Sequence, residues 1–376
     1  MRPARVFIPH TALGQGGAER VLIQLLGNLD RDLLVPSLGL TRDDGELRAR
    51  VPSDVTVHHT PAKSLWGALP SLTRTLAREK PDIVFSMGAI SVPVAFALAM
   101  LRSKVRFVIS ERNMLHHTSL TPKRWLITLL KRFSYRRADQ IIAVSEGVAD
   151  DLESKLKLSR EKIEVLYNPV VDSEMLAQAR EPLSHVWLED GMASILAVGR
   201  LVPQKDYPTL IRAFKQVRAE RSARLIILGD GPLKSELQGL IEAQGLAQDV
   251  ELAGFDANPF KYMSRATVFA LSSIHEGLPG ALIQAMACGA AVVSTDCPSG
   301  PSEIIENGID GYLVPIRDDG ALASRIVQLL DQPELRRELA AGARLSAERF
   351  RVETVVRAYE RVLLGEADNM SARADS

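Results

Sequence analysis

Two cations in the second half of the chain, Arg200 and Lys205, have the spacing that binding of an anion would need. Both follow an apolar run that ends at Gly199 in "VGRLVPQKDYPTLIRAF", and a predicted helix begins near Tyr207. At the carboxyl end of a parallel strand they would face a ligand crevice, where an arginine fork and a lysine point charge can neutralise a diphosphate. Two solvated loop cations would have the same spacing, so the pattern alone leaves both interpretations open.

A single acid, Glu276, stands in a short Gly/Pro-rich turn near the start of "SIHEGLPGALIQAMACG". The helix predicted around Pro279 would present open N–H groups that favour a phosphate. Glu276 would then accept hydrogen bonds from hydroxyl groups of the ligand beside that phosphate. Gln284 follows eight residues after Glu276, close to two helical turns, and would point to the same side. The alternative is a helix entry with a favourable acid.

Other turns at predicted strand ends are rich in glycine. Gly16 and Gly17 follow the first predicted strand and precede a helix, which suits close approach of an anion. Because residue 19 is Glu19, this loop does not match the dinucleotide fingerprint GxGxxG. Gly231 lies in "ILGDGPL" and Gly254 in "LAGF". Each of these turns is a weak signal by itself.

The composition is that of an ordinary globular protein, and it disfavours some functions. The 376 residues include 46 basic and 46 acidic side chains, whereas a general nucleic-acid binder would show a basic excess. Cys288 and Cys297 lack metal-site spacing and are predicted to be reduced thiols. The N-terminal residues "MRPARVFIPH" lack the apolar region typical of a signal peptide, and no apolar run of about 18 residues occurs in the sequence. We therefore expect a cytoplasmic protein, attached at most to the cytoplasmic face of a membrane.

Basic residues are concentrated from Arg102 to Arg137, where ten Lys/Arg stand against Glu111 alone. The segment 122–137 has an apolar stripe of helical period and a basic side: Leu126, Leu129, Leu130 and Phe133 form the stripe, and Arg124, Lys131 and Arg132 form the basic side. This pattern predicts either a helix docked on its own domain with a solvated basic face, or contact with anionic lipid headgroups, aided by Trp125 and Trp66.

Short apolar runs alternate with amphipathic stretches along most of the chain. Runs of this kind predict parallel strands that are buried on both faces. The predicted strands are 5–9, 34–40, 82–87, 105–110, 140–145 and 163–168, followed by 194–200, 224–230, 249–255, 266–272 and 290–296. A segment without clear period separates the two series. The most economical fold is two doubly wound α/β domains with a cleft between them.

The motifs become specific in combination. They occur in the order "GGAERVL", "VSEGV", "YNPVVD", "VGRLVPQKDYPTLIRAF", "ILGDGPL", "LAGF" and "HEGLPGALIQAMACGAAVVSTDCPSGPSEI". With them the chain closely resembles the retaining glycosyltransferases of family 4, over nearly its whole length and most strongly at 194–315. The resemblance implies the GT-B fold, in which two Rossmann-like domains face each other across a cleft. It implies an acceptor-side domain at 1–172, a nucleotide-sugar-binding domain at 190–347, and a helix and frayed tail at 348–376 that return to the first domain.

The resemblance also implies roles for individual residues. Arg200 and Lys205 would contact the donor diphosphate and Glu276 would bond the sugar hydroxyls, which makes these three the catalytic candidates. Donor contacts are implied for Gly16, Gly17, Gly199, Gly231, Gly254, Phe255, Gly277, Leu278, Pro279, Gly280 and Gln284. The family usually has a second glutamate where this chain has Gln284. That glutamate accepts bonds from both ribose hydroxyls, so an amide would alter this contact.

The acceptor side departs from the family as well. Many members carry a histidine after the strand that corresponds to 105–110, where this chain has "SERNMLHH". Glu111, Arg112, Asn113 and His117 are therefore the acceptor-side candidates.

The expected reaction is transfer of a hexosyl group from a nucleotide-sugar, UDP-linked on family frequency, to a hydroxyl of a glycan or lipid-linked acceptor. Such a reaction would belong to surface polysaccharide or glycolipid assembly. We expect no metal and no cofactor beyond the co-substrate, because cations and helix N-termini can neutralise the leaving diphosphate. Two alternatives stay open: a GT-B nucleotide-sugar epimerase, and a donor-binding protein without transfer activity.

Overall fold

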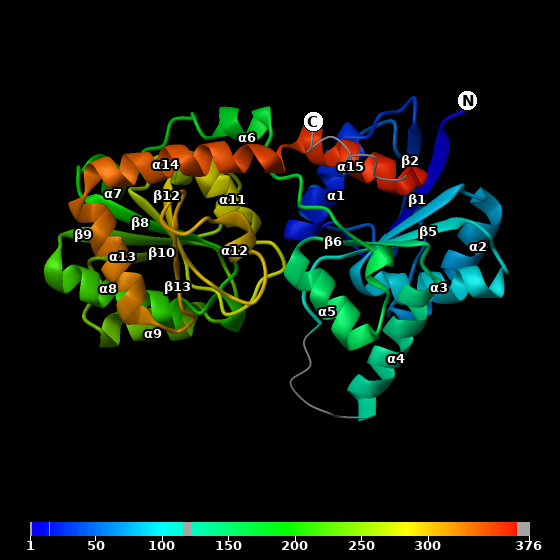
Figure 1. Ribbon diagram of the computed structural model, residues 1–376, viewed down its shortest axis with the longest axis horizontal. Helices are drawn as coiled ribbons and strands as arrows, with labels where there is room; N and C mark the ends of the chain where they lie inside the picture. The colour runs from blue at the N-terminus through cyan, green and yellow to red at the C-terminus, as the bar shows by residue number, and fades with distance from the viewer. Residues whose placement is uncertain (1, 15, 116–121, 367–376) are drawn as a thin grey trace, which may run out of the picture. The chain divides into compact units, whose positions relative to one another are not determined.

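The computed structural model describes residues 2–14, 16–115 and 122–366, with the backbone alone for 122–124. The described residues form two compact units (Figure 1). Unit 1 comprises Met1–Pro169 together with Val352–Ser376, and unit 2 comprises Val170–Arg351. The chain thus leaves unit 1 once and returns to it for its last helix.

Unit 1 is built on a seven-stranded sheet in which every strand pair is parallel. In spatial order its strands are β3 (Thr56–His59), β2 (Leu34–Leu40), β1 (Ala4–His10), β4 (Ile83–Met87), β5 (Arg106–Glu111), β6 (Gln140–Ala143) and β7 (Ile163–Val165). The winding reverses between β1 and β4, and β4 is buried along its whole length. Burial on both faces explains why these strands read as continuous apolar runs.

The helices of unit 1 cover both faces of this sheet. They are α1 (Gly17–Asn28), α2 (Leu69–Glu79), α3 (Ser91–Met100), α4 (Pro122–Arg137), α5 (Glu146–Leu156) and α15 (Val352–Leu364). Helix α2 packs on α3, α3 on α4 and α4 on α5, whereas α1 packs on α15 (Figure 1). Right-handed crossovers on either side of the reversal place these two groups of helices on opposite faces.

Helix α15 is held in unit 1 by polar contacts as well as by an apolar face. The buried carboxylate of Glu360 accepts a hydrogen bond from the Asp30 backbone N–H at 2.6 Å. Arg106 donates from Nε to the Leu363 carbonyl and from Nη2 to the Val362 carbonyl, each at 2.9 Å. A cation on the last carbonyls of a helix satisfies acceptors that have no partner within the helix.

Unit 2 has a six-stranded sheet that is again parallel throughout. Its strands in spatial order are β10 (Val250–Gly254), β9 (Ala223–Leu228), β8 (Ala193–Val198), β11 (Val268–Leu271), β12 (Ala291–Thr295) and β13 (Tyr312–Val314). The winding reverses between β8 and β11. Loops from the two directions of winding therefore meet at this point.

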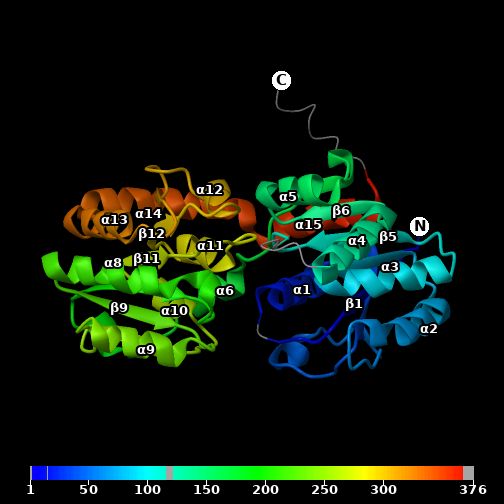
Figure 2. The ribbon, with the colours of Figure 1, turned by 90° about the horizontal axis from the view of Figure 1, so that it is seen from below.

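Helices flank this second sheet. They are α6 (Ser173–Gln178), α7 (Val186–Glu189), α8 (Tyr207–Glu220), α9 (Lys234–Ala243), α10 (Phe260–Met263), α11 (Gly280–Ala287), α12 (Pro301–Ile304), α13 (Asp319–Asp331) and α14 (Pro333–Ala347). Helix α8 packs against α9 and α13, while α11 packs against α10 and α14. Helix α10 also contacts α6, and the three helices α6, α10 and α11 lie side by side in Figure 2.

The side chains of α8 illustrate why the sequence folds in this way. Leu210, Ile211, Phe214 and Val217 recur at helical spacing, and all four are fully buried against the sheet. Pro208 lies in the first turn, where its missing N–H costs no helical hydrogen bond.

The prediction of two doubly wound parallel domains is confirmed, and two edge strands were not predicted. Strand β3, "TVHH", is polar and lies at the edge of its sheet, so it lacks an apolar run. Strand β13 also lies at an edge and is only three residues long. Neither segment offers a continuous apolar run of strand length, which is the signal used for the other strands.

The contact between Glu360 and Asp30 generates a test of how α15 is held. We expect Glu360→Ala to lower the free energy of unfolding by about 1–3 kcal/mol, because it leaves the Asp30 N–H without its acceptor. Urea titration followed by circular dichroism measures the change. Glu353→Ala, an exposed position on the same helix, is the matched control. Equal stability of the two variants would contradict the proposed contact.

Candidate functional site

Loops from several parallel strands meet at the carboxyl edge of the second sheet. The reversal of winding between β8 and β11 is the place where open α/β sheets bind ligands. Lys205 ends a 3-10 helix, η5 (Pro203–Lys205), that follows β8, and Glu276 lies in the turn between β11 and α11. The structure thus brings two of the predicted residues to the two sides of this point.

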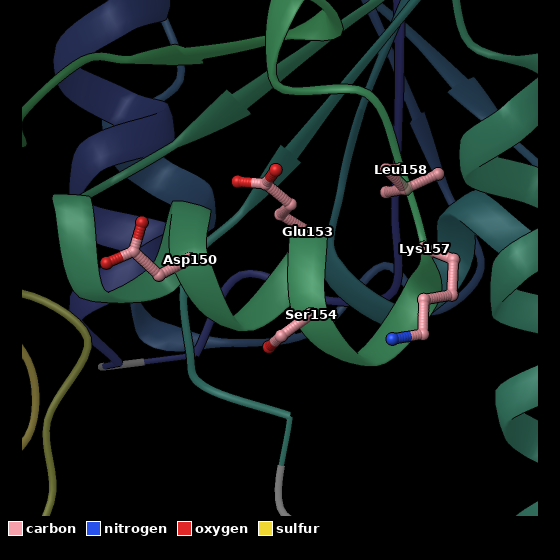
Figure 3. A pocket seen from close by; sticks show the side chains of 5 residues that line it. All are labelled: Asp150, Glu153, Ser154, Lys157 and Leu158. Atoms are coloured by element: carbon pink, nitrogen blue, oxygen red, sulfur yellow. The ribbon is translucent and has the colours of Figure 1, made fainter.

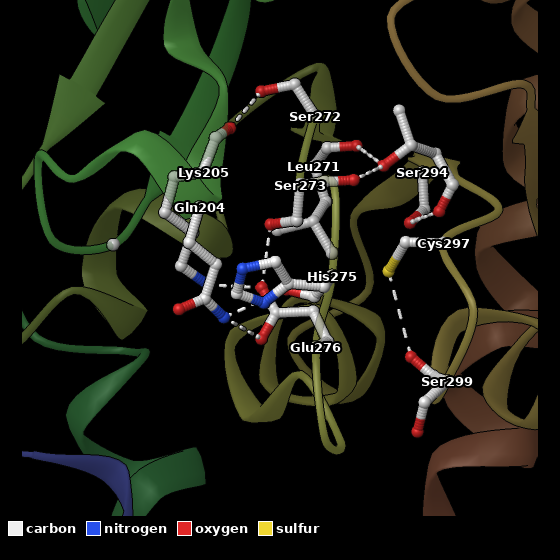
Figure 4. A network of polar contacts seen from close by, with 12 residues as sticks. Gln204, Lys205, Leu271, Ser272, Ser273, His275, Glu276, Ser294, Cys297 and Ser299 are labelled. Carbon is white, nitrogen blue, oxygen red and sulfur yellow. Dashed lines mark hydrogen bonds and ion pairs between the residues drawn. The ribbon is translucent and has the colours of Figure 1, made fainter. Parts of the chain in front are cut away.

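Glu276 is buried and is surrounded by donors (Figure 4). Its Oε1 accepts from Lys205 Nζ at 2.6 Å and from Ser273 Oγ at 2.7 Å, and Gln204 Nε2 lies 3.3 Å from its Oε2. A carboxylate has about four acceptor positions, two on each oxygen. Oε1 is filled by these contacts, so the remaining acceptor capacity of Glu276 is on Oε2.

Neighbouring loops hold this turn in place. Gln204 donates from Nε2 to the His275 backbone carbonyl at 2.9 Å, and the backbone carbonyl of Gln204 accepts from the Ile274 N–H at 2.9 Å. Ser272 Oγ donates to the Lys205 carbonyl at 2.7 Å, and Ser299 Oγ donates to the Gly277 carbonyl at 2.8 Å. The loops after β8, β11 and β12 are therefore one hydrogen-bonded assembly.

Burial shapes the chemistry of the groups around Glu276. Burial, reinforced by the nearby Glu276 carboxylate, raises the pKa of the Cys297 thiol to about 12. The same two causes raise the pKa of Tyr207, whose hydroxyl donates to the Gly199 carbonyl at 2.9 Å. Cys288, on the far end of α11, is also a free thiol, and burial raises its pKa to about 12. Both cysteines therefore remain neutral thiols at physiological pH.

The glycine turns after β8, β9 and β10 are adjacent at this edge. The Gly199 N–H donates to the Leu228 carbonyl at 2.9 Å, and the Gly229 N–H donates to the Gly254 carbonyl at 2.7 Å. Gly229 has φ +149°, and a Cβ there would lie 1.9 Å from the Gly199 carbonyl oxygen. Gly231 follows, and a Cβ there would lie 2.5 Å from the Leu201 carbonyl oxygen. Glycine at 229 is required because the two loops approach this closely.

The remaining predicted donor residues surround the same edge. Arg200 is exposed, and no hydrogen bond or ion pair engages its side chain within the parts of the chain that the structure describes. Leu278 is buried, Pro279 is the N-cap of α11, and Gly280 is its first residue. Phe255 follows Gly254 and is half exposed. Arg200 thus differs from Lys205, whose ammonium group is already engaged.

Gln284 has a partner of its own. Its Nε2 donates to the Val170 carbonyl at 3.4 Å, a long bond that leaves the amide oxygen available. A glutamate here would place a carboxylate against that carbonyl and could not donate. The amide therefore fits the local geometry, and its oxygen keeps its capacity to accept a hydrogen bond.

In unit 1, the predicted glycines lie at the start of α1. Gly16 is the N-cap and Gly17 is the first helical residue. A Cβ at Gly16 would lie 2.2 Å from Glu19 Oε2, so the Glu19 side chain folds back over this turn. A polar pocket beside the turn is lined by Thr11, Ala12, Gly14, Glu19, Arg42, Asp44, Gly45 and Glu46.

The acceptor-side candidates form a buried polar cluster at the end of β5. Glu111 accepts from Tyr135 Oη at 2.5 Å, from Lys131 Nζ at 3.2 Å and from the Arg112 N–H at 3.1 Å. Arg112 is buried and donates from Nη2 to the side-chain oxygen of Asn168. Asn113 is exposed, and His117 lies outside the described residues.

Electrostatic effects link this cluster to the first strand. Burial, followed by the charge and the hydrogen bond of Glu111, raises the pKa of Tyr135 well above its usual value. Burial lowers the pKa of His10; Glu19 opposes this effect and Arg112 adds to it. His10 Nδ1 lies 2.9 Å from the Ala12 carbonyl. The charges of Glu19 and Arg112 thus act on the His10 imidazole in opposite directions.

Several contact residues were not identified from the sequence. Ser273 precedes Glu276 by three residues and Asn168 lies in "YNPVVD", so both were within motifs but carried no separate signal. Gln204 lies in "VGRLVPQKDYPTLIRAF" and Tyr135 in the segment 122–137, and neither was predicted to be a site residue. An open hollow on α5, lined by Asp150, Glu153, Ser154, Lys157 and Leu158, contains no predicted site residue (Figure 3). Among the described residues, no group of three or more His, Cys, Asp or Glu could hold a metal ion.

The fold matches solved GT-B structures. Anabaena HepE in complex with UDP aligns with a TM-score of 0.80 at 21% identity, over 97% of this chain and 100% of that one. The lipopolysaccharide outer core galactosyltransferase WaaB aligns with a TM-score of 0.74 at 20% identity, over 96% of this chain and 99% of that one. Two doubly wound units of this kind define the GT-B class.

Family models cover both units. The model described as "Glycosyltransferase Family 4" matches residues 15–174, and the model described as "Glycosyl transferases group 1" matches residues 184–346. The chain belongs to glycosyltransferase family 4, and it is a glycosyltransferase.

Relatives of known name are similar over much of the chain. One is the N-acetylgalactosamine-N,N'-diacetylbacillosaminyl-diphospho-undecaprenol 4-alpha-N-acetylgalactosaminyltransferase of Campylobacter jejuni. It is 34% identical over 278 residues, which cover 72% of this chain and 73% of the relative. Another is the amylovoran biosynthesis glycosyltransferase AmsD of Erwinia amylovora, 26% identical over 93% of this chain and 96% of the relative.

Within the described ranges, every helix is too short or too polar to cross a membrane.

The ion pair between Lys205 and Glu276 generates a stability test. We expect Lys205→Met to lower the free energy of unfolding of unit 2, because a buried carboxylate loses its counter-charge. The loss should lie near the lower end of the range of about 3–5 kcal/mol that is typical of a broken buried ion pair. The double variant Lys205→Met/Glu276→Gln should recover much of this loss, since the stranded charge is removed. Urea unfolding measures both. If the double variant is no more stable than Lys205→Met, the unpaired Glu276 carboxylate is not the cause of the lost stability.

Proposed function

We propose that this glycosyltransferase moves a hexosyl group from a UDP-sugar, with retention, to a hydroxyl of a lipid-linked glycan. The observation that carries the donor assignment is the position of Glu276 at the switch point of the second sheet. Lys205 and Ser273 fix one of its oxygens, and the other retains acceptor capacity for a sugar hydroxyl. Arg200, exposed and unengaged among the described residues, is the cation available to the diphosphate.

The leaving diphosphate needs charge stabilisation as the glycosidic bond breaks. In the proposed mechanism Arg200 supplies a fork to its oxygens, and Lys205 supplies a point charge shared with Glu276. The first-turn amides of α11 add donors whose orientation is set before the substrate binds. We assign the neutralisation to these groups and propose no resident metal or other cofactor.

Similar proteins support the choice of donor and acceptor. HepE was solved with UDP and also with UDP-glucose, which favours uridine as the base. The Campylobacter relative is named for an acceptor linked through a diphosphate to undecaprenol, and AmsD is named for biosynthesis of amylovoran. We therefore place the reaction in the assembly of a surface glycan on a lipid diphosphate carrier.

Nucleotides and nucleotide-sugars should separate the roles of Arg200 and Glu276. We expect UDP to raise the melting temperature, since a ligand at 100 times its Kd adds about 2.7 kcal/mol. A cognate UDP-sugar should raise it further. Arg200→Met should weaken both effects by roughly 10-fold or more in Kd. Glu276→Gln should retain the response to UDP and lose the additional response to the sugar.

The control is Glu236→Gln, an exposed acid on α9. Stabilisation by GDP rather than UDP would contradict the donor assignment. Product formation from the donor alone would indicate an epimerase, and an inverted anomeric centre in the product would contradict retention. Transfer that EDTA abolishes would contradict the metal-independent mechanism.

We also infer that α4 brings the enzyme to an anionic membrane. Amphipathic helices usually pack their apolar side against the protein, but α4 exposes apolar side chains to the surface. Its Tyr135 is buried, and its Lys131 points inward to Glu111. The exposed apolar residues of α4 are Trp125, Leu126, Ile127, Leu129 and Phe133. Arg124, predicted on the basic side, has a side chain outside the described set.

Neighbouring elements extend this apolar surface. The ring of Phe133 lies 4.8 Å from that of Phe96 on α3, and Phe96 lies 5.3 Å from Trp66. Two exposed cations, Arg102 and Lys104, lie in the loop before β5. Arg137 at the end of α4 donates to the Ser103 carbonyl in this loop at 2.6 Å, so the loop is held beside α4. Apolar area with flanking cations suits a surface of anionic lipid.

Vesicle binding tests this inference. We expect the protein to sediment with phosphatidylglycerol vesicles and much less with phosphatidylcholine. Leu126→Ser/Leu129→Ser should weaken binding by at least roughly 10-fold, since burying one leucine side chain is worth about 1.5–3 kcal/mol. Leu345→Ser, an exposed leucine of unit 2, is the matched control. Equal binding of the double variant and the control would contradict a role for α4.

A further inference from the structure

Arg112 is a buried cation whose hydrogen-bonding capacity is only partly used. Its side chain follows β5, and the residue is 8% exposed. Nη2 donates to the side-chain oxygen of Asn168, but among the described residues Nη1 has no hydrogen-bond partner. Buried side-chain donors in folded proteins are nearly always paired. An unpaired nitrogen on a buried guanidinium is therefore a feature that requires a reason.

The charge of Arg112 is also uncompensated within the described residues. Its side chain forms no ion pair with a carboxylate there, and its one side-chain partner, Asn168, is neutral. The carboxylate of the adjacent acid, Glu111, accepts from the side chains of Tyr135 and Lys131. From Arg112 it accepts only the backbone N–H. A buried charge without a counter-ion is costly. An incoming anion would remove this cost.

The place of Arg112 in the fold is that of a ligand group. The strands of the first sheet are parallel, so β1, β5 and β7 end at the same edge, where open α/β sheets bind ligands. His10 ends β1, and the charge of Arg112 acts on its imidazole. Glu19 acts on the same ring and lines the polar pocket with Thr11, Arg42 and Asp44. Polar groups suited to saccharide hydroxyls therefore lie near this cation.

We propose that Arg112 binds a phosphoryl group of the acceptor, the group that links the acceptor saccharide to its lipid. This inference rests on the proposed function and extends it to the acceptor. Asn168 fixes one arm of the guanidinium fork, and the free Nη1 presents the other to phosphoryl oxygens. Burial strengthens such a bond because the local dielectric is low. Arg112 would thus select acceptors that carry phosphate over neutral glycosides.

Binding of farnesyl diphosphate to the full-length protein tests the proposal. The protein is first saturated with UDP, so that the donor site is filled, and farnesyl diphosphate is then titrated by calorimetry. We expect Arg112→Gln to weaken its binding on the order of 10- to 100-fold, the effect of a lost charged hydrogen bond. Binding of inorganic pyrophosphate should fall by the same factor. Arg112→Lys, which keeps the charge but loses the fork, should bind with intermediate affinity.

Two controls distinguish an anion site from a structural role. Arg74→Gln, an exposed arginine on α2, should bind farnesyl diphosphate as the parent protein does. Arg112→Gln should melt no lower than the parent, because it removes an uncompensated buried charge while keeping a donor for Asn168. If Arg112→Gln does not fold, the farnesyl diphosphate affinity of Arg112→Lys decides the test. An affinity equal to that of the parent protein would contradict a need for the guanidinium fork.

The arms of the experiment also separate the sources of the anion. If Arg112→Gln weakens UDP binding and leaves farnesyl diphosphate unchanged, Arg112 serves the donor and the proposal is wrong. If the parent protein binds UDP but neither diphosphate probe, the acceptor inference fails while the proposed donor chemistry stands. If no UDP-sugar or UDP binds, the proposed function fails independently, and the titration without UDP still reports on Arg112.

Discussion

Parallel pairing of every described strand pair is the constraint on which both candidate sites depend. Parallel strands in these sheets are buried on both faces, so charged groups that serve a ligand are most easily placed at the ends of the strands. Their carboxyl ends lie at one edge, and each loop there begins close to its neighbours. Lys205 and Glu276 meet across the reversal between β8 and β11 although 71 positions separate them in sequence. Pairing geometry, rather than any local preference, creates this contact.

The two units treat buried charge differently. In unit 2, Glu276 has a cation and a hydroxyl on one oxygen, and the surrounding loops satisfy one another's backbone groups. This turn is organised before any ligand arrives, which suits the proposed role of Glu276 in orienting a sugar. In unit 1, Arg112 is buried with a nitrogen left over. Its environment is completed only by a negatively charged partner.

Helix α4 shows how a tertiary contact can override a helical pattern. The apolar stripe of 122–137 reads as a face that packs inward, yet Leu126, Leu129 and Phe133 are exposed. Glu111, buried at the end of β5, instead draws Tyr135 and Lys131 toward the sheet. The hydrogen bonds to Glu111 satisfy a carboxylate that would be costly to bury without partners, which favours turning the polar side inward.

The sequence alone determined the fold class, and it predicted the donor-side residues, because both inferences start from local patterns. Apolar runs of strand length mark buried parallel strands, and the glycines, Arg200, Lys205 and Glu276 stand at the ends of those runs. Edge strands β3 and β13 were not predicted because neither offers a continuous apolar run of strand length. Only the tertiary structure decided which groups contact Glu276, which face of α4 is buried, and that Arg112 lacks a partner. Those facts depend on side chains that are distant in sequence and adjacent only after the sheets have formed.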